Sequence, residues 1–199
     1  MIEFWFDFAS TYSYPAAMRV EDLARRHGCN VQWHPFLLGP IFKEQGWPDS
    51  PFNIYPVKGR YMWRDVERLC TVLRLPFRKP SQFPRRSLLA TRIACAGAEN
   101  EWVAEFARKV YSANFAEDLD IGQPGVLLDC LSGLVEDPAA VLAAARGEAA
   151  KARVRHNTER AIELGIFGAP MFVVGEELFW GNDRLEASLE WRRNGEGLR

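Results

Sequence analysis

The sequence lacks an excess of charge of either sign. Its 25 lysines and arginines are balanced by 26 aspartates and glutamates, which leaves a net charge of −1. A chain without a basic field does not attract nucleic acid or anionic membranes. No apolar run approaches the length of a membrane span, and Glu3 and Asp7 interrupt the apolar start, which argues against a secretory signal. We therefore expect no nucleic-acid partner and no membrane partner.

Paired cysteines are missing as well. The four cysteines lie far apart, with no Cys-x-x-Cys motif and no metal-ligand spacing, and His34 and His156 are isolated. We predict no metal site, and we predict buried, unreactive thiols in a reducing compartment, which indicates a cytoplasmic protein. The cysteines are Cys29, Cys70, Cys95 and Cys130.

Aromatic residues, in contrast, are abundant. They make up 13% of the chain and include seven tryptophans, more than a minimal core requires, so some rings are expected to line a pocket. Several stand in a strand predicted over residues 2–8, which alternates apolar and polar positions. A helix over 13–27 and a second strand over 31–37 complete a βαβ unit.

The middle of the chain shows no strand-like alternation. Prolines and turns dominate from Gly39 to Pro56, and helical patterns follow over 58–74, 85–98, 99–113, 122–134 and 138–146. After them the pattern predicts a helix over 149–164, strands over 170–174 and 177–180, and a last helix over 183–193.

This order of elements predicts an α/β protein of thioredoxin-like fold, βαβ followed by ββα, with a large all-helical insertion. We expect residues 1–38 and 149–199 to form the thioredoxin-like domain and residues 39–148 to form the inserted helical domain.

Ser10 lies between the first strand and the first helix. A serine at this position often caps the helix by accepting a hydrogen bond from an orphan N–H group. The same hydroxyl is also able to donate a hydrogen bond to a thiolate, which lowers the pKa of that thiol. Because Ser10 has no adjacent base, an acyl-enzyme role is poorly supported.

Two later segments carry further polar groups. Pro170 precedes a strand, and if its peptide bond is cis the backbone of Ala169 is exposed to an extended peptide. Asp183 and Glu186 have the spacing of a capping box. A glycine beside exposed N–H groups, with Asn182 and Asp183, would also suit a ligand that carries a carboxylate and an amine on one carbon.

The middle region adds cations and rings. Most of these cations are expected to form a solvated face, whereas the rings interleaved with them are candidates for an aromatic pocket. The polar residues are Asn53, Lys58, Arg60, Arg64, Arg85 and Arg86, and the apolar ones are Trp47, Tyr55, Tyr61, Met62 and Trp63.

Three ordered segments resemble a known family. FDFASTYSYP resembles the F-D-x-x-S-P-x-S-Y opening of the kappa-class glutathione transferases and the bacterial 2-hydroxychromene-2-carboxylate isomerases. FGAPMF is similar to their F-G-V-P-T-F segment, and WGNDRLE to their F/W-G-N/S-D-R-L/x-E segment. The resemblance spans essentially the whole chain. Thr11 departs from it, because a proline usually follows the serine, and its hydroxyl is a competitor for the role of Ser10.

The resemblance implies a glutathione-dependent enzyme on a DsbA-like scaffold, commonly a homodimer. Ser10 would hold the glutathione thiolate, and Ala169, beside cis Pro170, would pair with the cysteinyl backbone. The remaining contacts would come from Asn182 and Asp183 at the γ-glutamyl end, from Lys58 near the glycine end, and from Asn53.

The leading hypothesis is an isomerase of aromatic catabolism that interconverts 2-hydroxychromene-2-carboxylate and trans-o-hydroxybenzylidenepyruvate by reversible thiolate addition. The first alternative is a kappa-like transferase that conjugates glutathione to electrophiles. The second is a non-catalytic thioredoxin-like module that binds peptides. A DsbA-type oxidoreductase is nearly excluded, because no cysteine lies near position 10.

Overall fold

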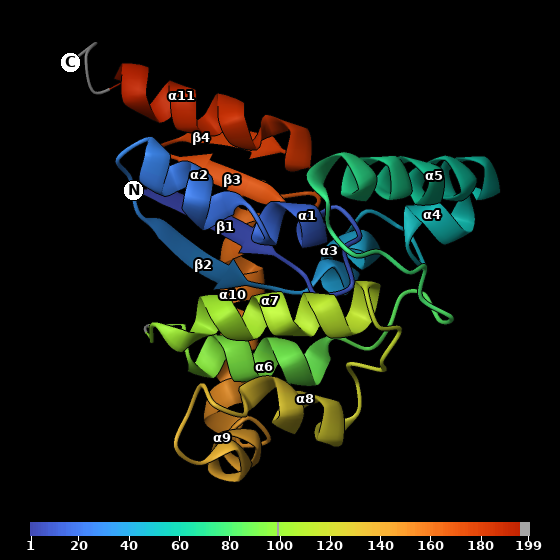
Figure 1. The fold of residues 1–199 in the computed structure, drawn as a ribbon, viewed down its shortest axis with the longest axis vertical. Coiled ribbons are helices and arrows are strands. Elements are labelled where there is room, and N and C mark those ends of the chain that lie inside the picture. Colours follow the sequence, from blue (N-terminus) through green and yellow to red (C-terminus); the bar gives the residue numbers. More distant parts are fainter. Residues whose placement is uncertain (99, 196–199) are drawn as a thin grey trace.

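A four-stranded mixed sheet forms the centre of the molecule (Figure 1). The computed structural model describes residues 1–98 and 100–195. The strand order is β2-β1-β3-β4, with β1 parallel to β2 and antiparallel to β3, and β3 antiparallel to β4. The strands are β1 (Ile2–Phe6), β2 (Val31–Pro35), β3 (Met171–Val174) and β4 (Glu177–Trp180).

Alternating side chains of β1 supply both faces of this sheet. Phe4 and Phe6 belong to the larger core, under α1 (Ser13–Ala17), α2 (Val20–Arg26) and α11 (Leu185–Gly195). Trp5 belongs to a smaller core on the opposite face, with residues of α3 (Leu38–Glu44) and α10 (Glu148–Glu163). The period of two along the strand therefore places helices on both faces.

The remaining helices come from the middle of the chain. In Figure 1 helices α6 to α9 lie below the sheet, whereas α4 and α5 lie to one side of it. They are α4 (Pro51–Ile54), α5 (Pro56–Leu73), α6 (Leu88–Ala96), α7 (Trp102–Phe115), α8 (Pro124–Leu131) and α9 (Pro138–Ala144).

Two features of the predicted element order are wrong. Helices α3 and α4 occupy the stretch in which prolines and turns were expected to dominate and no helix was predicted. The single helix predicted over 13–27 is two helices, because the backbone leaves helical geometry at Arg19, with φ −120°. The guanidinium of Arg19 reaches the segment before α11, so a tertiary contact accompanies the break.

The other expected elements are present with shifted ends. The first strand ends at Phe6 instead of residue 8, and the helix expected from 85 begins at Leu88. A 3₁₀ turn, Asn182–Arg184, precedes α11. The expected helix start at residue 99 and the last residues, 196–199, of the expected C-terminal part lie outside the described residues.

The middle helices share one core with the sheet. Phe8, at the end of the β1 segment, packs against Phe106 and Tyr111 of α7, with ring centroids 6.2 and 5.3 Å away. All three rings belong to the cluster that holds Phe4 and Phe6. The two predicted domains are thus in direct apolar contact, and the domain boundaries themselves stay a prediction.

Candidate functional site

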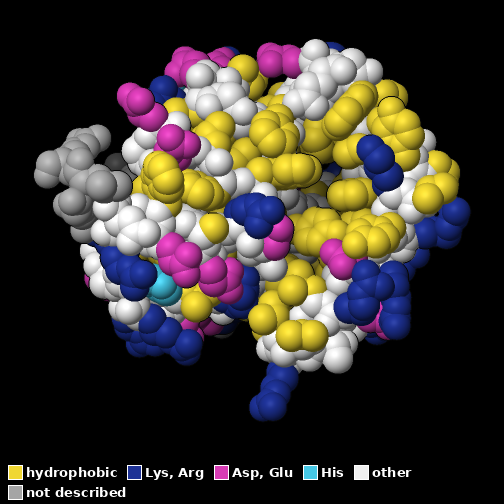
Figure 2. All heavy atoms as spheres, turned by 90° about the horizontal axis from the view of Figure 1, so that it is seen from above, with side chains coloured by type: hydrophobic (Ala, Val, Ile, Leu, Met, Phe, Trp, Pro, Cys, Tyr) yellow, Lys and Arg dark blue, Asp and Glu magenta, His cyan; other side chains and the backbone are white. Residues whose placement is uncertain are grey.

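A cleft of about 1510 Å³ opens where β1 ends. The turn after β1, the region from α3 to α5, the loop before α6 and the ends of β3 and β4 surround it. Hydrophobic side chains gather around a hollow on the face drawn in Figure 2. Its apolar wall is built by Phe42, Trp47, Phe52, Tyr61, Leu69 and Val72. A pocket of this kind, mostly apolar with a few polar groups, is the usual form of a small-molecule site.

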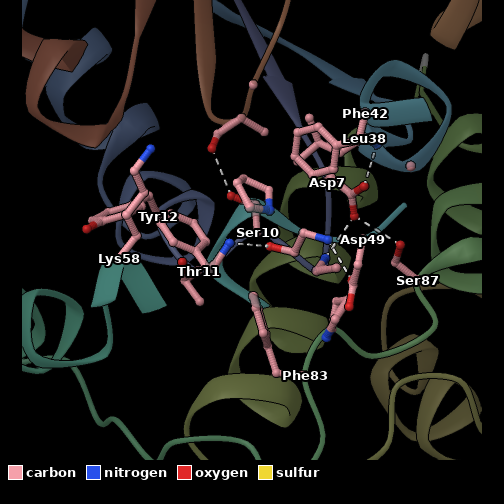
Figure 3. A pocket seen from close by; sticks show the side chains of 18 of the residues that line it. Asp7, Ser10, Thr11, Tyr12, Leu38, Phe42, Asp49, Lys58, Phe83 and Ser87 are labelled. Carbon is pink, nitrogen blue, oxygen red and sulfur yellow. Dashed lines mark hydrogen bonds between the residues drawn. The ribbon is translucent and has the colours of Figure 1, made fainter. Parts of the chain in front are cut away.

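Ser10 lines this cleft at the turn before α1 (Figure 3). Its Oγ donates a hydrogen bond to the carbonyl oxygen of Ala169, 2.9 Å away, and accepts one from the backbone N–H of Ser13 at 3.3 Å. Ser10 lies two residues before the N-cap of α1, Tyr12, which makes no side-chain capping bond, but the Ser10 hydroxyl does satisfy the N–H of the first helical residue. The proton of the same hydroxyl points to the other segment of the cleft.

Ala169 and Pro170 form that other segment. The Ala169–Pro170 peptide bond is cis, and Ala169 lines the cleft while Pro170 is buried. The carbonyl of Pro170 accepts a hydrogen bond from the N–H of Gly181 at 3.0 Å. This bond brings the segment 181–183 alongside Ala169.

Gly168 allows the closest approach of this segment to β4. A Cβ added at Gly168 would lie 2.6 Å from Nε1 of Trp180, which no real Cβ does. The indole of Trp180 therefore occupies the space that a side chain at 168 would need. Its outer side is exposed and lines the cleft together with Phe167, whose ring centroid is 5.0 Å away.

Asn182 and Asp183 both line the cleft, but they are held differently. Asn182 is buried, and its Oδ1 and its carbonyl oxygen both accept hydrogen bonds from Arg19, at 3.1 and 3.2 Å. Asp183 is exposed, and among the described residues its carboxylate has one ion-pair partner, Arg184, at 3.6 Å. Glu186 forms an ion pair with Arg19 at 2.7 Å and Gly181 carries no capping side chain, so the capping-box interpretation is wrong.

Of the two expected ligand-binding residues Lys58 and Asn53, one lines the cleft and the other does not. Lys58 lines the cleft with its Nζ 4.8 Å from the ring centroid of Tyr55. Asn53 is not among the lining residues. Its side-chain amide donates to a carboxylate oxygen of Asp49 at 2.9 Å and to the carbonyl of Phe83 at 3.3 Å. Asn53 therefore supports the loop beside the cleft.

The threonine that replaces the usual proline is buried. Thr11 is 1% exposed, and its Oγ1 has no hydrogen-bond partner within the part of the chain that the structure describes. It is the Ser10 hydroxyl, and not that of Thr11, that bridges to Ala169.

Asp7 is a lining residue that the sequence reasoning did not select. Its carboxylate is 3% exposed and accepts hydrogen bonds from the N–H groups of Ala9 and Leu38 and from Oγ of Ser87 (Figure 3). Burial raises the pKa of Asp7 although these three hydrogen bonds lower it. The available signal was a charged residue inside an apolar strand, directly before the turn.

A second missed group joins the turn to α5. Tyr12 donates its phenolic proton to Asp65 at 2.9 Å, and Asp65 also accepts from Arg68 at 3.0 Å. Partial burial and the hydrogen bond to Asp65 raise the pKa of Tyr12 beyond the usual range of a phenol. All three residues line the cleft.

The expected aromatic pocket is confirmed only in part. Trp47 and Tyr61 line the cleft, whereas Met62 is fully buried in the core and Trp63 packs edge-on against Phe83 at 4.9 Å. Tyr55 is half-exposed beneath Lys58 and is not a lining residue.

The cysteines and histidines stay outside the cleft. All four cysteines are free and buried, as predicted, and burial raises the pKa of Cys70 to about 11 and that of Cys95 to about 12. His34 stacks on Trp5. Over residues 1–98 and 100–195 no cluster of His, Cys, Asp and Glu has a composition that could hold a metal ion. No helix in these ranges is long and apolar enough to cross a membrane.

Comparisons with known proteins agree with this geometry. A family model described as the DSBA-like thioredoxin domain matches residues 1–190. A 2-hydroxychromene-2-carboxylate isomerase of Sphingobium xenophagum is 30% identical over 186 residues, which cover 93% of this chain and 94% of that protein. Glutathione S-transferase kappa 1 of Homo sapiens is 27% identical over 202 residues, covering 93% and 87%.

A solved structure agrees as well. The selenomethionine form of a 2-hydroxychromene-2-carboxylate isomerase has a TM-score of 0.84 and 26% identity, and the match covers 100% of this chain and 98% of that one. These likenesses confirm the predicted fold and the predicted family resemblance, and they support an enzyme over a binding module.

Proposed function

Because the chain belongs to the DsbA-like thioredoxin domain family and has serine at the turn before α1, we propose that the cleft binds glutathione and isomerises a small aromatic electrophile of the 2-hydroxychromene-2-carboxylate type. The observation that carries this proposal is the hydrogen bond between Ser10 and Ala169 inside the apolar cleft. It brings a hydroxyl donor and an open backbone edge together.

The residues present fit this tripeptide. The Ser10 hydroxyl carries the proton that a thiolate needs, and Ala169 offers its backbone at the rim of the cleft. Asp183 is an exposed carboxylate with room for an amine, while Asn182 is fixed beside it by Arg19. Lys58, on α5, supplies a cation that lines the same cleft.

Bound glutathione would supply a thiolate able to add to a conjugated electrophile and leave again. The task of Ser10 is to donate its proton to that sulfur, which favours the charged form at neutral pH. Ala169 then gains an acceptor oxygen free of Ser10, available to a peptide N–H. The apolar wall from Phe42 to Val72 orients the aromatic ring and excludes water, which strengthens the hydrogen bond from Ser10.

Conjugation of glutathione to electrophiles is the second candidate, since it uses the same residues. Relatives named as kappa transferases are 25–27% identical, and those named as isomerases are 28–30% identical, so the isomerase remains first. Peptide binding without chemistry ranks last, because a peptide docked on Ala169 has no use for so large an apolar cleft.

Calorimetric titration with glutathione tests the proposal. Wild-type protein is expected to bind, and Asp183→Ala to bind at least about tenfold more weakly through loss of a charge-assisted contact. Asp22→Ala is the matched control, because Asp22 is exposed on α2 and pairs only with Arg25. No binding by the wild type would overturn the proposal.

A spectroscopic assay then separates the two reactions. Addition of 2-hydroxychromene-2-carboxylate with catalytic glutathione should change the absorbance to that of the isomerised product. Stoichiometric consumption of glutathione with 1-chloro-2,4-dinitrobenzene, without any isomerisation, would instead support the transferase.

We further propose a cytoplasmic homodimer active in aromatic catabolism. The four unpaired thiols suit a reducing compartment. The homodimer rests on the resemblance to a family whose members are commonly homodimers. Sedimentation velocity at micromolar concentration should give a dimer, and a monomer would contradict this assignment.

A further inference from the structure

Four cations line the cleft, and three of them are engaged within the protein. Arg85 is buried and bonded to Asp118, to Asn114 and to the carbonyl of Leu119. Arg68 is paired with Asp65, and Lys58 lies over the ring of Tyr55.

Arg86 is the fourth. Within the described ranges it donates no hydrogen bond and forms no ion pair, and it is exposed to the cleft. A guanidinium has five N–H donors in a planar fork that matches a carboxylate. Arg86 is therefore the cleft cation whose donors are available to a ligand.

The backbone at Arg86 is held from both sides. Arg85 is anchored in the protein interior, and Ser87 donates its hydroxyl proton to Asp7 at 3.0 Å. Gly122 packs against it as well, since a Cβ there would lie 3.4 Å from the carbonyl oxygen of Arg86. The fixed backbone removes one part of the ordering cost of binding, and the loss of rotamer freedom of the Arg86 side chain remains to be offset by its contact with the ligand.

Arg86 also lies close to the proposed reaction centre. Ser87, its neighbour, bonds Asp7, and the carbonyl of Asp7 accepts the N–H of Ser10 at 2.9 Å. One wall of the cleft thus carries Ser10, Asp7 and Arg86 in order.

The electrostatic surroundings leave Arg86 positive. The pKa of Asp120 is lowered by hydrogen bonds from the side chain of Gln123 and the N–H of Gly122, both at 2.9 Å, and by the charges of Arg85 and Arg86, so its carboxylate lies near Arg86 and already accepts two hydrogen bonds. Behind Arg86 a small hollow of about 280 Å³ is lined also by Arg92 and Arg146. These neighbouring cations make an anion at Arg86 more favourable.

We infer that Arg86 forms the subsite for a carboxylate of the electrophilic substrate, so that the cleft selects aromatic carboxylates over neutral aromatic electrophiles. The inference rests on the proposed function in taking this cleft as the substrate site. Arg86 is then the residue that confers selectivity. The substrate carboxylate binds on the side of the cleft formed by Ser10, Asp7 and Arg86, and not at Lys58.

Direct binding without glutathione tests the subsite separately from the reaction. The probes are trans-cinnamate and its neutral analogue, trans-cinnamamide, titrated by calorimetry into wild type, Arg86→Gln, Arg86→Lys and Arg60→Gln. Arg60 is the matched control, an exposed arginine of α5 that is not among the lining residues. Thermal unfolding of each variant verifies that it is folded.

Wild type should bind cinnamate at least about tenfold more tightly than cinnamamide, since a charge-assisted bidentate contact is worth a factor of this size or more. Arg86→Gln should remove this preference, Arg86→Lys should keep part of it, and Arg60→Gln should keep all of it. Equal binding of the two probes by wild type, or an unchanged preference in Arg86→Gln, would overturn the inference.

A kinetic comparison connects the subsite to turnover. Arg86→Gln should raise KM for 2-hydroxychromene-2-carboxylate about tenfold or more and leave KM for 1-chloro-2,4-dinitrobenzene and the affinity for glutathione unchanged. If wild type fails to bind glutathione while the cinnamate preference holds, the proposed function is wrong and the carboxylate subsite stands.

Discussion

At the scale of single residues, the Ser10 hydroxyl has one proton to donate and two possible acceptors for it, the carbonyl oxygen of Ala169 and a bound thiolate. In the structure the proton goes to Ala169, and a bound thiolate would take it over. Ser10→Ala should therefore raise the pKa of the glutathione thiol in the complex and lower kcat by roughly 10²-fold, the usual effect of removing one donor to a developing charge. Thiolate absorbance followed across a pH titration measures the first effect.

Thr11 provides the contrasting variant. Its buried hydroxyl has no partner among the residues described. Thr11→Val keeps the shape and removes a polar group that is costly to bury, so the free energy of unfolding should stay equal or rise by up to about 1 kcal/mol. The pKa of the bound thiol should not change. If Thr11→Val raised that pKa and Ser10→Ala did not, the two hydroxyls would have exchanged roles.

Asp7 predicts a pH dependence. Its pKa is raised in the folded protein, so between the unfolded and the folded pKa the native state binds more protons, and stability falls as pH rises through the folded value. The unfolding free energy of wild type minus that of Asp7→Asn should therefore decrease from pH 4 to pH 7. Urea titrations at four pH values measure this difference, and an increase would contradict it.

At the scale of elements, Arg19 connects the break between α1 and α2 to the segment before α11. Its side chain is 19% exposed and contacts both Asn182 and Glu186. Arg19→Gln should cost about 1–2 kcal/mol of stability and weaken glutathione binding, since Asn182 loses its support.

The control for this prediction is Arg25→Gln. Arg25 and Asp22 form an exposed pair on α2, 78 and 64% exposed, and such pairs contribute little. Chemical denaturation should place Arg25→Gln within about 0.5 kcal/mol of wild type. An equal decrease in the free energy of unfolding in both variants would mean that the Arg19 contacts stabilise the fold no more than an exposed ion pair does.

The sequence predicted the sheet and most helices because their patterns are local. It failed at α3 and α4 because prolines were taken as turn residues, whereas Pro40 lies in the first turn of α3 and Pro51 at the first position of α4. Proline is tolerated there, since that N–H has no partner in a helix. Ser50, which accepts the N–H of Phe52 at 3.3 Å, was a readable sign of such a start.

The candidate site was predictable to the same extent. Ser10, Ala169, Asn182 and Asp183 lie in short motifs, and all of them line the cleft. The sequence could not show that Lys58 lines the cleft and Asn53 does not. Asn53 is held by a hydrogen bond to the carbonyl of Phe83, a contact between segments far apart in the sequence.

At the scale of the whole molecule, one apolar cluster includes residues of the sheet and of α7. We therefore expect one cooperative unfolding transition, with coincident fluorescence and circular dichroism curves. Phe106→Ala, at a fully buried ring, should cost about 3–5 kcal/mol and shift both curves together. Two separate transitions would indicate that the helical region folds independently.

The burial of all four cysteines has a practical consequence for chemical labelling. Every native thiol within the described residues is shielded, and burial also raises the pKa of Cys130 to about 11. A Ser10→Cys variant would therefore carry a single reactive sulfur, at the wall of the cleft and at the start of a helix. Replacing the Ser10 oxygen by sulfur would therefore give one site for attaching a spin label or fluorophore, whose signal would report ligand binding in the cleft.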